Sequence, residues 1–285
     1  MTLLSPPLMA RLESLQLHSR HRLVGRFGWE HISRRYGNTI DFADFREYHP
    51  GDDFRRLDYH VMARLDQVLI KLYEADDEVT VRLMVDTSAS MGIGGKLDQA
   101  RRVAAALGFV ALSNHDSVTV HTFPSTGAPP RFSGRSSIPA FFAHLEALTA
   151  AGPTPFAQAA AHVLSRQRLP GMTIVISDLL TPEWRSLMQL RSSGSDATIL
   201  HVLCEEDLRP EHSGDLELVD RESRERLTVS VTDDISRSYR ARVELWRDDV
   251  MQTATATGAH YSAIDADEDI EELLLRSWRE AGVLR

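Results

Sequence analysis

The chain has 285 residues, of which 42% are hydrophobic and 26% charged, and its formal net charge is -9. This composition is ordinary for a globular protein and excludes a fibrous repeat or a wholly disordered chain. The negative charge argues against general nucleic-acid affinity, because counterion release needs clustered lysine and arginine. The apolar stretches are shorter than the roughly 20 residues of a membrane-spanning helix, and the first ten residues lack the basic start of a secretory signal. We therefore expect a cytoplasmic protein without a membrane span.

Residues 1–75 differ from the rest of the chain. They are rich in arginine, aromatic residues and turn signals, with a helix expected near Pro7 to Leu17 and irregular chain after it. We expect this segment to form an N-terminal arm or cap and residues 76–285 to form the main domain.

From residue 78 onward, short β-branched apolar runs alternate with amphipathic helical stretches. This alternation is typical of an α/β fold with a largely parallel sheet. The predicted strands are 79–85, 117–123, 172–177, 197–203 and 260–264, and the predicted helices are 97–111, 138–148, 155–168, 182–190, 233–257 and 270–281. Residues 216–219 and 226–231 flank a charged turn, which indicates a hairpin at the sheet edge.

Three oxygen-bearing side chains, Asp86, Ser88 and Ser90, directly follow the first of these strands. In an open parallel sheet, ligands bind where loops leave the carboxyl ends of the strands. Alternate spacing lets the three side chains turn toward a common point. Taken alone, an Asp-x-Ser-x-Ser pattern is weak, and a capping or turn role is its default explanation.

Two later residues fit the same site. Thr154 stands in a loop just before a predicted helix, and Asp178 ends the strand 172–177. Hydroxyl and carboxylate oxygens, without imidazole or thiolate, suit a hard cation, so the expected ion is Mg²⁺ or Mn²⁺.

The run Asp86-Thr87-Ser88-Ala89-Ser90-Met91, together with Thr154 and Asp178, resembles the metal-ion-dependent adhesion site of von Willebrand factor A domains. The resemblance covers roughly residues 78–281. It implies a von Willebrand factor A-like, Rossmann-like sheet flanked by helices. It also implies that the two serines and the threonine approach the ion directly, that the aspartates act largely through water, and that a partner's carboxylate completes the coordination.

A second block, FREYHPGDDFRRLD at residues 45–58, with Ala63-Arg64 and Lys71 after it, resembles the signature of the bacterial family called domain of unknown function 58. In that family the block precedes a von Willebrand factor A-like domain. The resemblance implies a protein partner, a MoxR-type AAA+ ATPase with its client, for which this chain would act as adaptor. The sequence has no P-loop of its own.

Four arginines of this segment have two explanations. Arg46, Arg55, Arg56 and Arg64 alternate with acidic residues, and such networks commonly serve positioning, here by fixing the arm to the sheet. The alternative is a docking surface for the partner.

An enzyme is the competing interpretation, because a Mg²⁺ or Mn²⁺ site at a sheet edge also describes phosphatases and nucleases. Such a hydrolase needs a positioned base or nucleophile beside the metal, and the Asp86 loop has a hydroxyl at Ser88 where an aspartyl-phosphate chemistry would need a second carboxylate. A serine hydrolase built on Ser88 with His121 or His201 lacks a Gly-x-Ser-x-Gly elbow. We therefore expect a binding module without catalytic activity.

Overall fold

A computed structural model describes residues 3–13, 15, 41–47, 68–74, 79–124, 127–166, 171–193, 196–210 and 212–274. The chain divides into two compact units, one formed by Met1–His21 with Val79–Arg285 and the other by Arg22–Glu78. The helix α1 (Pro6–Leu12) therefore belongs to the same unit as the main domain, where its Leu8 and Leu12 are buried.

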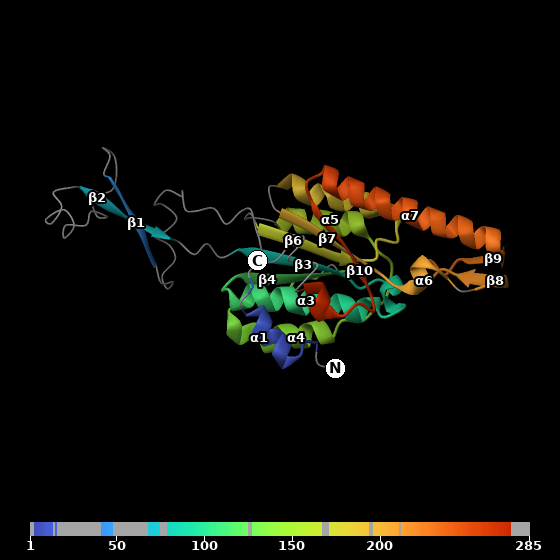
Figure 1. The fold of residues 1–285 in the computed structure, drawn as a ribbon, viewed down its shortest axis with the longest axis horizontal. Coiled ribbons are helices and arrows are strands. Elements are labelled where there is room, and N and C mark those ends of the chain that lie inside the picture. Colours follow the sequence, from blue (N-terminus) through green and yellow to red (C-terminus); the bar gives the residue numbers. More distant parts are fainter. Residues whose placement is uncertain are drawn as a thin grey trace. The chain divides into compact units, whose positions relative to one another are not determined.

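The main unit is built on a six-stranded sheet with the order β10-β7-β6-β3-β4-β5 (Figure 1). All neighbouring strands are parallel except β5, which pairs antiparallel with β4. The strands are β3 (Thr80–Asp86), β4 (Ser117–Phe123), β5 (Arg131–Ser133), β6 (Gly171–Ser177), β7 (Asp196–Leu203) and β10 (His260–Asp265). This mostly parallel mixed sheet confirms the predicted α/β, Rossmann-like fold.

Helices cover both faces of the sheet (Figure 1). One core cluster joins α3 (Lys96–Ser113), α4 (Ile138–Glu146) and α1 to one face. A second cluster joins α5 (Phe156–Arg166), η5 (Pro182–Ser193) and the end of α7 (Asp233–Ala256) to the other. Strand β3 shows why: Leu83 and Val85 lie in the first cluster and Met84 in the second. A strand buried on both faces requires a continuous apolar run, as the sequence has there.

Most predicted elements of the main unit are confirmed, and the exceptions lie at its margins. Strand β5 was not predicted, because three residues are too few to show a period. The hairpin of β8 (Gly214–Val219) and β9 (Arg226–Val231) forms a sheet of its own, so its predicted place at the edge of the main sheet is wrong. The helix predicted at 182–190 is a 3-10 helix. The last helix is described as α8 (Ile270–Glu272), and its predicted continuation to 281 lies largely outside the described residues.

The second unit contains an antiparallel pair, β1 (Asp41–Glu47) and β2 (Leu69–Glu74), where we expected irregular chain. Arg46 lies in β1 opposite Ile70, whereas Arg55, Arg56 and Arg64 lie outside the described residues. Among the described residues of both units, no helix combines the length and apolar character needed to cross a bilayer.

Candidate functional site

The two predicted aspartates lie at the carboxyl ends of neighbouring strands. Asp86 is the last residue of β3 and Asp178 follows the last residue of β6, and these strands pair directly. Both aspartates are fully buried. The serines follow Asp86 at the start of the short helix η3 (Ala89–Gly92), with Ser88 at its N-cap. The sequence therefore placed the aspartates and serines at one end of the sheet, and the structure brings them there.

Thr154 reaches the same place through the loop between α4 and α5. Two backbone bonds join this loop to the one after β3: Ala89 N donates to Gly152 O at 2.9 Å, and Ala151 N donates to Thr87 O at 2.8 Å. Gly152 has a φ of +81°, and a Cβ there would come within 2.9 Å of Pro124 Cγ, so the loop requires glycine at this position. The loop is thus held with Thr154 largely buried.

The oxygen atoms of the serines have a spacing that suits a shared ion. Ser88 Oγ and Ser90 Oγ are 3.0 Å apart. Two ligands on adjacent corners of a Mg²⁺ octahedron, each at 2.0–2.1 Å from the ion, are separated by about 3 Å. This spacing also allows a hydrogen bond between the two hydroxyls in the absence of an ion.

Asp86 is oriented by two neighbours. Its Oδ1 accepts a hydrogen bond from Ser88 N at 2.8 Å, and its Oδ2 accepts one from Ser177 Oγ at 2.6 Å. Burial, and next the charge of Asp178, raise the pKa of Asp86 to about 7, although the hydrogen bonds from Ser177 and Ser88 oppose this rise. The charge of Asp178 thus disfavours the ionised form of Asp86, and a cation beside the two residues would favour it.

Lys96, the first residue of α3, places a positive charge beside Asp178. It was not among the predicted site residues. Its Nζ lies 2.8 Å from Asp178 Oδ2 and 3.0 Å from Asp207 Oδ2, and its side chain is fully buried. Burial lowers the pKa of Lys96, but the charges of the two carboxylates outweigh burial and raise it above its usual value. The sequence did hold a signal, because Lys96 lies four residues before Ala100 on the apolar face of the helix.

These residues fit a hard divalent cation. When Asp86, Asp178 and Asp207 are all ionised, their negative charge exceeds the single positive charge of Lys96. The predicted donors are all oxygen, and each oxygen of Asp86 keeps a lone pair beyond the bond described above. No group of three or more His, Cys, Asp or Glu able to hold a metal occurs within the described part of the chain. The candidate set has two carboxylates, and its other donors are hydroxyls.

Glu222 and His201 also contact this end of the sheet, Glu222 through Thr154 and His201 through Asp178. The sequence did not reveal these contacts. Thr154 donates from its N to Glu222 Oε2 at 3.0 Å and from its Oγ1 to Glu222 Oε1 at 2.7 Å. His201 Nε2 bonds the carbonyl oxygen of Asp178 at 3.0 Å, and its Nδ1 bonds the hydroxyl of Tyr261 at 2.9 Å. Burial lowers the pKa of His201 to about 4, so this imidazole is neutral at physiological pH and positions the end of β6.

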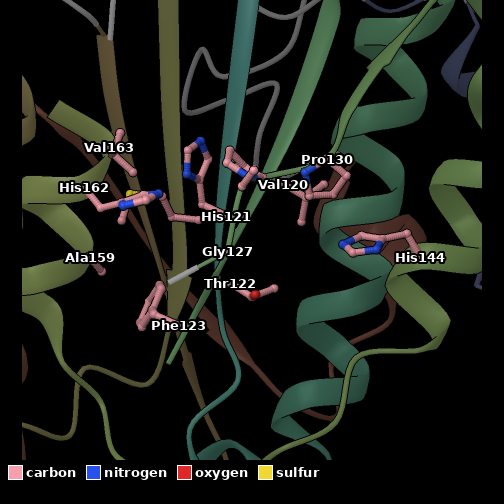
Figure 2. Close-up of a pocket in the computed structure, with 13 residues that line it drawn as sticks. Val120, His121, Thr122, Phe123, Gly127, Pro130, His144, Ala159, His162 and Val163 are labelled. Atoms are coloured by element: carbon pink, nitrogen blue, oxygen red, sulfur yellow. The ribbon is translucent and has the colours of Figure 1, made fainter. Parts of the chain in front are cut away.

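A pocket of about 170 Å³ (Figure 2) has none of the five predicted residues in its lining. It is lined by His121 and Phe123 of β4, by His162 of α5, and by His144 of α4. The rings of His121 and His162 meet edge to face with centroids 6.3 Å apart. His121 thus belongs to this pocket, and His201 is engaged by Asp178 and Tyr261.

Together, the fold and this cluster define a mostly parallel α/β protein with hydroxyl and carboxylate oxygens gathered at the carboxyl end of its sheet. Residues 44–248 match the family described as protein of unknown function DUF58, and the chain belongs to that family. The match includes the 45–58 block and all five predicted site residues.

Similar proteins come from mycobacteria. Uncharacterized proteins of Mycobacterium bovis and Mycobacterium tuberculosis are each 29% identical over 278 residues, which cover 93% of this chain and 86% of the relative. Among solved structures, BatB of Bacteroides thetaiotaomicron is 14% identical with a TM-score of 0.43, covering 71% of this chain and 98% of that chain. An aerotolerance-related membrane protein of Bacteroides fragilis is 15% identical with a TM-score of 0.45, covering 72% and 98%.

Proposed function

We propose that this protein is a non-enzymatic binding module of the von Willebrand factor A-like kind, which holds Mg²⁺ or Mn²⁺ to grip a partner protein. The observation that supports this most is the convergence of Asp86, Ser88, Ser90, Thr154 and Asp178 from three loops, with the two serine hydroxyls 3.0 Å apart.

The hydroxyl and carboxylate residues would play different parts in holding the ion. The hydroxyls of Ser88, Ser90 and Thr154 are neutral donors, so they can hold an ion without saturating its charge. Asp86 and Asp178 supply negative charge from buried positions. The ion, when bound, offers a Lewis-acidic position for a carboxylate of the partner.

The proposed partner is a MoxR-type AAA+ ATPase with its client, as the family resemblance implies. Because the chain has no P-loop, ATP hydrolysis would come from that partner. Copurification with such an ATPase should depend on Mg²⁺ and should be lost in Asp86→Ala and Thr154→Ala. Undiminished copurification by both variants would contradict a contact made through the metal.

The first test is metal binding by the whole chain. Titration calorimetry with Mg²⁺ and Mn²⁺ should show saturable binding that a Ser88→Ala, Ser90→Ala double variant loses. Free metal at ten times its Kd should add about 1.4 kcal/mol of stability, which raises the unfolding midpoint by about 3 to 6 °C for a domain of this size.

The same preparations separate binding from catalysis. Phosphatase, nuclease and esterase activities are measured with Mg²⁺ or Mn²⁺ beside an Asp86→Ala control. Robust metal-dependent turnover that disappears in the control would replace the binding module with a hydrolase.

A further inference from the structure

The β8–β9 hairpin packs little of its surface against the rest of the main unit. None of its strand residues is buried, and apolar Leu218, Val219 and Leu227 are all exposed. A two-stranded hairpin without a buried face is marginally stable by itself. Its position therefore depends on the contacts that its turn and its flanking residues make.

The turn at the tip of the hairpin, residues 220–225, is nevertheless well ordered by its own hydrogen bonds. Asp220 Oδ1 accepts from Glu222 N at 2.7 Å and from Ser223 N at 2.9 Å. Asp220 N donates to Glu225 O at 2.9 Å, and Arg224 N donates to Asp220 O at 3.0 Å. Asp220 thus shapes the turn as an aspartate commonly does, by accepting from backbone N–H groups two and three residues on.

This turn presents Glu222 to the candidate metal site. Both carboxylate oxygens of Glu222 accept from Thr154, at 2.7 Å from Oγ1 and 3.0 Å from N, although the two residues are 68 positions apart in the chain. Glu222 is half-buried, whereas Arg221 and Ser223 on either side of it are exposed. Within the turn, it is therefore the side chain of Glu222 that packs against Thr154.

We propose, on the basis of the function proposed above, that Glu222 is the chain's own carboxylate ligand for the ion at Ser88, Ser90 and Thr154, occupying the position that a partner's carboxylate takes. The 2.7 Å between Thr154 Oγ1 and Glu222 Oε1 is close to the separation of about 3 Å between adjacent ligands of a six-coordinate Mg²⁺.

This arrangement makes the hairpin a competitor of the partner. A partner carboxylate gains the ion only by displacing Glu222, and the hairpin can leave because it has no buried strand residue to expose. Only molecules in which Glu222 has left the ion can bind the partner, so the apparent affinity is the intrinsic affinity multiplied by the fraction of such molecules. The partner implied by this chemistry is a protein with an exposed Asp or Glu that binds more tightly than a tethered glutamate.

The test uses the full chain with Mn²⁺ as the probe and three variants: Glu222→Gln, the control Glu225→Gln, and the Ser88→Ala, Ser90→Ala double variant. Glu225 lies in the same turn and is exposed, so its replacement removes the same charge without touching Thr154. Free Mn²⁺ is followed by electron paramagnetic resonance, and the solvent access of bound Mn²⁺ by water-proton relaxation.

We expect Glu222→Gln to raise the Kd for Mn²⁺ about tenfold, because affinity follows the number of charged ligands. Relaxation per bound ion should rise as water replaces the carboxylate, and added acetate should lower it in Glu222→Gln more than in the wild type. Glu225→Gln should match the wild type in all three measurements.

Other outcomes would overturn the inference in distinguishable ways. If Glu222→Gln binds Mn²⁺ with wild-type affinity and relaxation while the double serine variant does not bind, Glu222 is no ligand and the proposed function stands. Equal weakening of Mn²⁺ binding by Glu222→Gln and Glu225→Gln would mean that only the loss of one negative charge near the site matters, and not direct ligation by Glu222. Absence of Mn²⁺ binding by the wild type and by Glu222→Gln would remove the metal site and the inference with it.

Discussion

The carboxyl end of the main sheet and the β8–β9 hairpin hold charged side chains in opposite ways. Asp86, Lys96 and Asp178 are fully buried, and hydrogen bonds join Lys96 to Asp178 and Ser177 to Asp86. Glu222 stands on a hairpin without a single buried strand residue. Charged groups in the first region are costly to alter, because their surroundings cannot readily supply water. Changes in the second region should cost little free energy of unfolding, because its strands bury no residue. The contact between Glu222 and Thr154 thus joins an exposed hairpin to the buried end of the main sheet.

The largest expected effect in this comparison is that of Lys96→Met. The change leaves the carboxylates of Asp178 and Asp207 without the ammonium that contacts both, at 2.8 and 3.0 Å. Removing one partner from a buried charge cluster costs about 3 to 5 kcal/mol. The free energy of unfolding in urea measures this loss.

The matched control for that variant is Arg185→Met. Arg185 pairs with Asp249 on the surface, where both side chains are about half exposed, so its loss should cost about 0 to 1 kcal/mol. Equal losses in Lys96→Met and Arg185→Met would show that burial does not distinguish the two ion pairs.

An intermediate effect is expected for Ser177→Ala. The Ser177 hydroxyl donates to Asp86 Oδ2 at 2.6 Å and accepts from Leu179 N at 2.9 Å, both in buried positions. Leaving these groups without their partner should cost about 1 to 3 kcal/mol. Chemical denaturation of the metal-free protein gives the value.

Ser165→Ala is the control here, because Ser165 is exposed and its hydroxyl donates to the carbonyl of His162. Its cost should remain within about 0.5 kcal/mol. A wild-type stability for Ser177→Ala would mean that water takes over both hydrogen bonds.

The smallest expected effect is that of shortening the hairpin. Gly214 and Val231 are paired across its base, so an Asn-Gly turn can replace residues 215–230. Because the strands bury no side chain, the free energy of unfolding should change by less than about 1 kcal/mol. A loss above about 3 kcal/mol, seen in urea unfolding, would place the hairpin with the rigid part of the molecule and remove the contrast between the regions.

The sequence was sufficient to predict that oxygen-bearing side chains lie at the ends of β3 and β6. Asp86 and Asp178 each follow an apolar run, and such runs identify buried strands wherever they are long enough to show a pattern. Strand β5, of three residues, and the pair β1 and β2 within an arginine-rich segment show no such pattern and were missed.

What the sequence by itself determined is most of the strands and helices of the main unit, their buried faces, and the oxygen-bearing side chains at the ends of β3 and β6. Periodicity decides these because it depends only on neighbours along the chain. Only the tertiary structure decided the strand order, the burial of Lys96 against Asp178 82 residues away, and the contact of Glu222 with Thr154. Such contacts depend on how whole elements pack, and no local pattern reports which distant residue will lie opposite.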